Sequence, residues 1–196
     1  MKQFLLLCIN GALMTILGMI DSSFGNNMGV DAIIVLASLG TLNYLFRNVA
    51  MLGECCYQCD PTKFTESFII NVFTSILSGM LMVTASSLTA SLFEVSQRQN
   101  ELLVTCIVVY GVGLPISQAE NFFKRYLIIT GKNKELIGAT VIFYISMIAL
   151  DAVCLFLHTE CYWLIVGTVT CNVITDLYNI IVCKCYKGLI NLIGIL

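Results

Sequence analysis

The chain has 196 residues, of which 58% are hydrophobic and 11% are charged, and its formal net charge is −2. A water-soluble domain carries about 25% charged residues because its surface faces water. The composition therefore predicts an all-α integral membrane protein whose outer surface contacts a lipid bilayer. No basic face is available to neutralise phosphates, so nucleic acid is not an expected partner.

Six apolar stretches are long enough to cross about 30 Å of hydrocarbon. The first of them continues beyond the length of a signal peptide and contains no A-x-A cleavage pattern, which favours a spanning helix over a cleaved leader. The sequence predicts one domain over residues 1–196, a bundle of six transmembrane helices at residues 4–24, 32–53, 68–92, 102–123, 136–157 and 163–183.

The polar breaks between these stretches predict turns. The expected turns are Gly25-Asn26-Asn27, Asp60-Pro61-Thr62, Gln97-Arg98-Gln99-Asn100, Gly131-Lys132-Asn133-Lys134 and His158-Thr159-Glu160.

The basic residues predict the orientation, because positive charges concentrate in cytoplasmic loops. If the six helices alternate in direction, one side carries Lys2, Lys63, Lys124, Arg125, Lys132, Lys134, Lys184 and Lys187, while Arg98 lies on the other side. This asymmetry predicts a multi-pass protein of the plasma membrane with both termini in the cytoplasm.

Two aspartates and a threonine reach a similar estimated depth in the outer half of the membrane. At about 1.5 Å per residue, Asp21 lies roughly 25 Å from the cytoplasmic edge of its helix, Asp151 roughly 22 Å and Thr170 roughly 20 Å. An aspartate at the centre of a transmembrane helix costs about 2.5–3.5 kcal/mol, so each one needs a partner or a function.

Two carboxylates at one depth disfavour each other's ionisation, since desolvation and like charge both act against the charged form. Asp21 and Asp151 could therefore hold one proton and release it when a cation arrives. The alternative is that each aspartate only bonds a neighbouring helix. Asp176 and Asn172 form a possible secondary polar site, and the position of Asp176 between Asn172 and Asn179 favours a hydrogen-bonded helix contact.

Two further features of the fourth helix invite interpretation. Glu120 precedes Lys124 by four residues, which predicts an ion pair of modest strength on the helix surface near the membrane interface. Pro115 removes a backbone hydrogen bond and predicts a kink, which could be a gating element or a packing feature.

Ten cysteines do not indicate a disulfide scaffold, because such scaffolds occur in short secreted domains. Cys56, Cys59, Cys183 and Cys185 could supply four thiolates to zinc, and thiols next to the membrane could be acylated. Their spacing is loose, and no metal site or cofactor is expected.

Several short motifs follow one another along the chain. They are Leu17-Gly-Met-Ile-Asp21-Ser-Ser-Phe-Gly25 with Met28-Gly-Val-Asp-Ala32, then Leu114-Pro115-Ile116, the basic turn around Gly131-Lys132-Asn133-Lys134, and Ile148-Ala-Leu-Asp151. In this order they resemble the first six helices of the multidrug and toxic compound extrusion (MATE) transporters. The resemblance covers residues 4 to 188.

The resemblance implies a cation-coupling site at Asp21 and Asp151, with Thr170 as a looser match. Two departures are Met147, where the family often has asparagine, and the cysteine-rich loop that contains Cys55. The family has two such lobes and this chain matches one. A parallel repeat can be replaced by a homodimer, because both copies keep one orientation.

These observations predict a half-size MATE-like transporter that exports amphipathic or cationic small molecules in exchange for H⁺ or Na⁺. It would work as a homodimer or with a second six-helix lobe. The alternative is a membrane subunit that does not transport, or a split lobe of a larger transporter. An enzyme is not expected, since the chain has no HExxH or paired catalytic motif and its one histidine is His158 in an outer loop.

Overall fold

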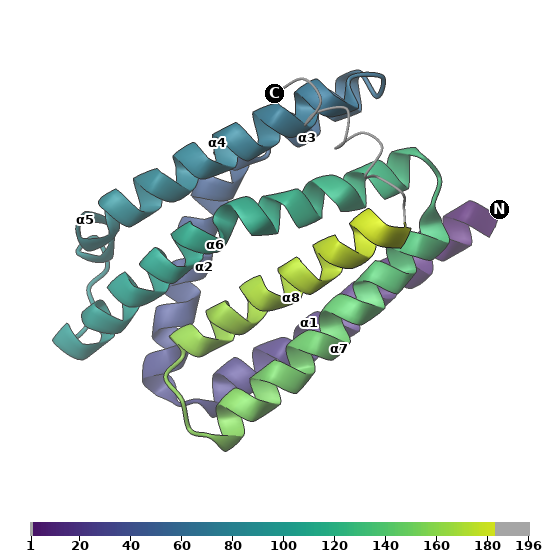
Figure 1. The fold of residues 1–196 in the computed structure, drawn as a ribbon. Helices are drawn as coiled ribbons and strands as arrows, with labels where there is room; N and C mark the ends of the chain where they lie inside the picture. The colour runs from purple at the N-terminus through teal and green to yellow at the C-terminus, as the bar shows by residue number, and fades with distance from the viewer. Residues whose placement is uncertain (1, 183–196) are drawn as a thin grey trace.

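The computed structural model describes residues 2–182, and Figure 1 shows them as a bundle of α-helices. Within this part of the chain there is no β-strand. The eight described helices are α1 (Lys2–Asn27), α2 (Val30–Ala50), α3 (Leu52–Cys59), α4 (Phe64–Thr84), α5 (Ser86–Ala90), α6 (Gln97–Ile129), α7 (Asn133–Phe156) and α8 (Tyr162–Val182).

Five of the described helices, α2, α4, α6, α7 and α8, are long and apolar enough to cross a membrane. Within α1, the described residues include a further, shorter apolar stretch at Leu5–Ile16. The predicted fold class, a helical membrane bundle, is therefore confirmed.

The long helices form a layer in which α4, α6, α8 and α7 follow one another (Figure 1). α1 packs along α7, and α2 packs against both α4 and α6. The largest core cluster includes Val35 and Leu39 of α2, Leu103 and Ile107 of α6, and Ile165 of α8. This arrangement places α6 and α8 at the centre of the bundle.

α6 and α8 run parallel in one register. Cys106 contacts Cys161, and Asn172 donates a hydrogen bond to Ser117, and in both contacts the residues are 55 positions apart. Because the offset is the same at both places, the residues of α6 between Cys106 and Ser117 lie level with the residues 55 positions later in the chain.

The helices approach most closely where glycines face each other. A Cβ atom on Gly79 of α4 would overlap the carbonyl oxygen of Gly111 on α6, and one on Gly111 would lie 3.0 Å from the carbonyl oxygen of Gly79. Small residues allow helix backbones to approach in this way inside membranes. Pro115 follows one turn later, and α6 continues through it as one helix that changes direction about midway (Figure 1).

Several helix ends differ from the predicted turns. α6 begins at Gln97, because Ser96 accepts a hydrogen bond from the Gln99 backbone while the Gln99 side chain accepts one from the Ser96 backbone. This capping box satisfies the first turn of the helix, so a segment predicted as a turn is helical. α1 likewise continues to Asn27, and the chain turns at Gly29, whose φ of 104° favours glycine.

The predicted turns at Gly131 and His158 are present, and both residues have positive φ. The second predicted helix ends early at Ala50, and the short helix α3 follows after Met51. α3 packs on α4 and α6 through Tyr57, whose ring contacts Phe64 and Phe122.

One end of the bundle carries most of the basic residues. The α6–α7 turn and the start of α4 lie together at the upper right of Figure 1, near the N-terminus. The described basic residues of these segments are Lys63, Lys124, Arg125, Lys132 and Lys134. We call this the basic end. Lys184 and Lys187 lie outside the described residues.

Candidate functional site

An ion pair lies inside the bundle on α6. Lys124 Nζ is 2.7 Å from Glu120 Oε1, and their side chains are 16% and 3% exposed. The Lys124 ammonium group also lies 5.2 Å from the ring centroid of Phe143 on α7, a cation–π distance. The predicted pair is present, but it is enclosed between helices instead of lying on the outer surface.

Asp176 of α8 lies on a neighbouring pocket between α6 and α8. The pocket has a volume of about 290 Å³, and its other lining residues are Pro115, Ile116, Ala119, Val173, Leu177 and Ile180. Asp176 Oδ1 is buried and has no hydrogen-bond partner among the described residues. Among the described residues, Asp176 is therefore the one charged group of a pocket with apolar walls.

The three charged groups of this region form one electrostatic cluster. Asp176 lies within electrostatic range of both Glu120 and Lys124. With all three ionised, these three groups alone have a net charge of −1, because Lys124 compensates one carboxylate, and Arg47 of α2 also lies within electrostatic range of Glu120. The remaining negative charge favours a bound proton or cation, since an isolated charge in a low-dielectric region is costly. We call Glu120, Lys124 and Asp176 the inner cluster.

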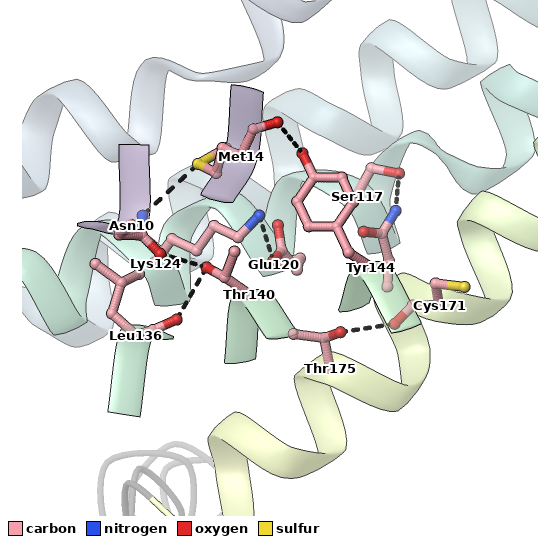
Figure 2. Close-up of polar contacts among 11 residues, drawn as sticks. Asn10, Met14, Ser117, Glu120, Lys124, Leu136, Thr140, Tyr144, Cys171 and Thr175 are labelled. Carbon is pink, nitrogen blue, oxygen red and sulfur yellow. Dashed lines mark hydrogen bonds and ion pairs between the residues drawn. The ribbon is translucent and has the colours of Figure 1, made fainter. Parts of the chain in front are cut away.

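Polar contacts between helices lie around Glu120 and Lys124, as Figure 2 shows. Asn172 Nδ2 donates a hydrogen bond of 2.8 Å to Ser117 Oγ, and it therefore bonds to α6 instead of to Asp176. Asn179 is fully buried, and neither atom of its amide has a hydrogen-bond partner in the described chain. The helix contact predicted at Asn172 is present, whereas the described bonds do not include Asp176 in it.

α1 and α7 also run parallel in one register. Thr140 Oγ1 donates a hydrogen bond of 2.7 Å to Asn10 Oδ1, and Tyr144 donates one of 3.4 Å to the Met14 carbonyl oxygen (Figure 2). Both contacts join residues 130 positions apart.

The same offset of 130 positions makes Asp21 of α1 level with Asp151 of α7 along the two helices. The backbone of Asp21 belongs to α1, while its side chain lies outside the described part of the structure. This register agrees with the equal depths that the sequence predicts for the two residues, and their coupling function remains a prediction.

Asp151 is 1% exposed and faces α8 at Gly167. A Cβ atom on Gly167 would lie 3.8 Å from Asp151 Oδ1 and 3.5 Å from Leu150 Cβ, so the glycine leaves space beside the carboxylate. Thr170 is on a different face of α8, where it is exposed and donates its hydroxyl hydrogen to the Val166 carbonyl oxygen. The structure therefore does not bring Thr170 to Asp151.

The acidic residues occupy two levels of the bundle. Gly167, beside Asp151, and Asp176 are nine positions apart on α8, which is about 13 Å along the helix axis. The inner cluster is nearer the basic end, and Asp151 is nearer the opposite end. Any ion that visits both levels must therefore move a distance close to half the hydrocarbon thickness.

A second groove follows α2 on the other side of α8. One part has a volume of about 350 Å³ and the other about 190 Å³, and both are lined by Leu36, Ile165 and Thr168. The polar groups of the smaller part include Ser117 and Asn43, whose side-chain oxygen accepts a hydrogen bond from Tyr110. Apolar walls with a few polar groups are typical of small-molecule sites.

The short helix α3 adds a buried acid at the basic end. Glu54 is 5% exposed, and burial raises the pKa of its carboxyl group above the usual value of 4.5. Arg125 and Arg47 act in the opposite direction and lower this pKa, while Glu120 raises it. Glu54 lies beyond the end of α2 and therefore outside the spanning segments.

The cysteines named in the sequence are only partly placed. Cys55, Cys56 and Cys59 are exposed on α3, whereas Cys183 and Cys185 lie outside the described residues. No group of three or more metal-binding side chains occurs in the part of the chain that the structure describes.

Sequence reasoning did not single out the inner cluster as a site. Glu120 and Lys124 have a spacing that also occurs on exposed helix surfaces, and Asp176 was expected to take part in a hydrogen-bonded contact between helices. The signal that could have identified the site was the position of the ion pair. Glu120 and Lys124 both lie well inside a helix that continues to residue 129.

Comparison with known proteins does not assign the chain to a family. No family model, curated protein or solved structure matches it.

Proposed function

We propose that this membrane protein is a half-size, MATE-like secondary transporter. It exports amphipathic or cationic small molecules in exchange for H⁺ or Na⁺. It acts as a homodimer or together with a second six-helix lobe, in the plasma membrane and with both termini in the cytoplasm. The short motifs that resemble the family support this proposal, and so does the membrane-helix fold.

The observation that carries the proposal is Asp176 in its apolar pocket between α6 and α8. The carboxylate has a buried oxygen without a hydrogen-bond partner among the described residues, and the pocket volume is about 290 Å³. An organic cation with an apolar body fits this chemistry, because its charge pairs with the carboxylate and its body contacts the apolar walls. The Asp176 carboxylate that lines the pocket favours a ligand with a positive charge.

The coupling ion binds at the outer level, at Asp21 and Asp151. The shared register of α1 and α7 supports this assignment, because it gives both aspartates one level in the bundle. Asp151 is 1% exposed and faces Gly167 of α8, so an ion reaches this carboxylate only when the packing of α7 and α8 opens. Coupling then requires that occupation of one acidic level alters the affinity of the other.

A membrane subunit without transport activity is the second candidate. It is favoured by the bonds that several polar side chains make between neighbouring helices, such as Asn172 to Ser117 and Thr140 to Asn10. Bonds of this kind stabilise a bundle whether or not it carries a substrate.

Ion-driven efflux of a fluorescent lipophilic cation from proteoliposomes tests the proposal. We expect Asp176→Asn to weaken substrate binding, so that the apparent KM rises while efflux at saturating substrate still depends on the ion gradient. We expect Asp151→Asn and Asp21→Asn to abolish the dependence on the gradient. Asp60→Asn is the matched control, because it removes an exposed loop carboxylate at the basic end.

Two results would contradict the proposal. Equal gradient-dependent efflux by the wild type and by the Asp21→Asn, Asp151→Asn double variant would refute the coupling site. Wild-type protein that folds and inserts but catalyses no ion-driven efflux of any tested organic cation would favour the subunit without transport activity. The mass of the complex in nanodiscs tests the two-lobe requirement, and an active monomer would refute it.

A further inference from the structure

Two cysteines meet at the end of the bundle opposite the basic end. Cys106 belongs to the first part of α6, and Cys161 immediately precedes α8. Their sulfur atoms are 3.9 Å apart, and the residues are 0% and 3% exposed. Both belong to the core cluster that α2 also contributes to.

The two thiols are held together by the register of the parallel helices. The offset of 55 positions that joins Cys106 to Cys161 also joins Ser117 to Asn172 farther along α6 and α8. The pairing therefore follows from how the two helices pack, with Cys161 in the turn that leads into α8. A disulfide has a sulfur–sulfur distance of about 2.05 Å, so rotation of the side chains must bring the sulfurs about 1.9 Å closer.

A polar pocket lies beside this pair. It has a volume of about 130 Å³, and Cys161 lines it together with the charged residues Asp31, Arg98 and Glu160. Cys161 is therefore the cysteine of the pair that borders this polar pocket, whereas Cys106 does not line it. The exposed thiols Cys55, Cys56 and Cys59 are on α3, at the other end of the bundle.

We propose that Cys106 and Cys161 form a disulfide bond that ties the start of α6 to the connection between α7 and α8. The oxidant is a disulfide compound, either a small molecule or a thiol oxidoreductase on the extracytoplasmic side. The bond itself rests on the geometry of the pair and is independent of the transport function, and the side from which the oxidant acts rests on the proposed orientation.

The bond forms by two exchange reactions. The Cys161 thiolate attacks one sulfur of the donor disulfide and forms a mixed disulfide, and one thiol of the donor leaves. The Cys106 thiolate then attacks the Cys161 sulfur, and the second donor thiol leaves. Two electrons pass from the cysteine pair to the donor, and the two protons of the protein thiols end on the two released thiols.

A protease site in the turn between α6 and α7 allows the bond to be detected on a gel. Cys106 precedes Gly131 in the chain and Cys161 follows it, so a protease site inserted after Gly131 in the full-length protein separates them. Intact cells are incubated with glutathione disulfide and then with N-ethylmaleimide, and the purified protein is cleaved and run on a non-reducing gel. We expect one linked band that dithiothreitol converts to two fragments.

Substitutions assign the bond to its cysteines. We expect Cys106→Ala and Cys161→Ala each to give two separate fragments without reductant, and Cys171→Ala, which removes another buried cysteine of α8, to keep the linked band. Separate fragments from the wild type, both in cells and after the same treatment of detergent-solubilised protein, would overturn the proposal. A bond that forms only after solubilisation would overturn its formation from the extracytoplasmic side.

Discussion

Removing the Lys124 charge should destabilise the protein more than removing the Glu120 charge. In Lys124→Met, the Glu120 carboxylate remains inside the bundle with a side chain that is only 3% exposed. Breaking a buried pair in this way costs about 3–5 kcal/mol, because an uncompensated charge stays in a low-dielectric region. In Glu120→Gln, the lysine side chain is 16% exposed and can extend its ammonium group toward the nearby membrane interface, so the loss is smaller.

The double variant Glu120→Gln, Lys124→Met leaves no charge of this pair behind. We therefore expect it to be more stable than Lys124→Met alone, although it contains one more substitution. The measurement is reversible unfolding in mixed micelles for the wild type and the three variants, which gives the coupling free energy of the pair. Equal losses for the two single variants, or a double variant whose loss is the sum of theirs, would refute a buried and interacting pair.

Three other predictions concern topology, packing and pH. A cysteine introduced near Gly131 should react with a membrane-impermeant maleimide only after permeabilisation, whereas one near Asn27 should react on intact cells; the reverse pattern would invert the orientation. Gly79→Ala should lower the free energy of unfolding by about 1–3 kcal/mol, because its Cβ overlaps the Gly111 carbonyl oxygen, whereas Gly40→Ala, with no atom within 4 Å of the added Cβ, should not. The raised pKa of Glu54 makes the folded state bind more protons than the unfolded state, so the free energy of unfolding should fall as the pH rises above about 4.5. Glu54→Gln should reduce this fall, and an unchanged unfolding profile of the wild type between pH 4 and pH 8 would contradict the prediction.

The sequence predicts the membrane class because composition alone decides it. An outer surface with so few charges cannot face water, and the apolar stretches are long enough to span a bilayer. The ends of the helices are less predictable, because short polar segments can either turn or cap a helix. Ser96 and Gln99 form a capping box, which extends α6 through residues that resemble a polar loop. Glycine was an incomplete signal, since Gly131 has a positive φ at a predicted turn, whereas Gly25 was predicted to turn and lies within α1, and the chain turns at Gly29 instead.

The position of a residue along a helix is easier to predict than the direction of its side chain. A rise of 1.5 Å per residue gives the depth, and the register between α1 and α7 agrees with one level for Asp21 and Asp151. The same arithmetic gave Thr170 a similar depth, but its side chain is exposed, and it is Gly167 that faces Asp151.

Side-chain direction is harder to predict than depth because of what surrounds a membrane helix. In a water-soluble helix, apolar residues gather on the buried face, and their period shows which way each side chain points. A membrane helix is apolar toward the lipid and toward its neighbours, so the apolar pattern does not distinguish the two faces. The face that a helix turns toward its neighbour must then be inferred from pairs of residues that share one offset in the sequence. Ser117 and Asn172 are 55 positions apart, as are Cys106 and Cys161. Such a shared offset identifies two parallel helices that face each other, and it becomes evident only when the structure shows which residues meet.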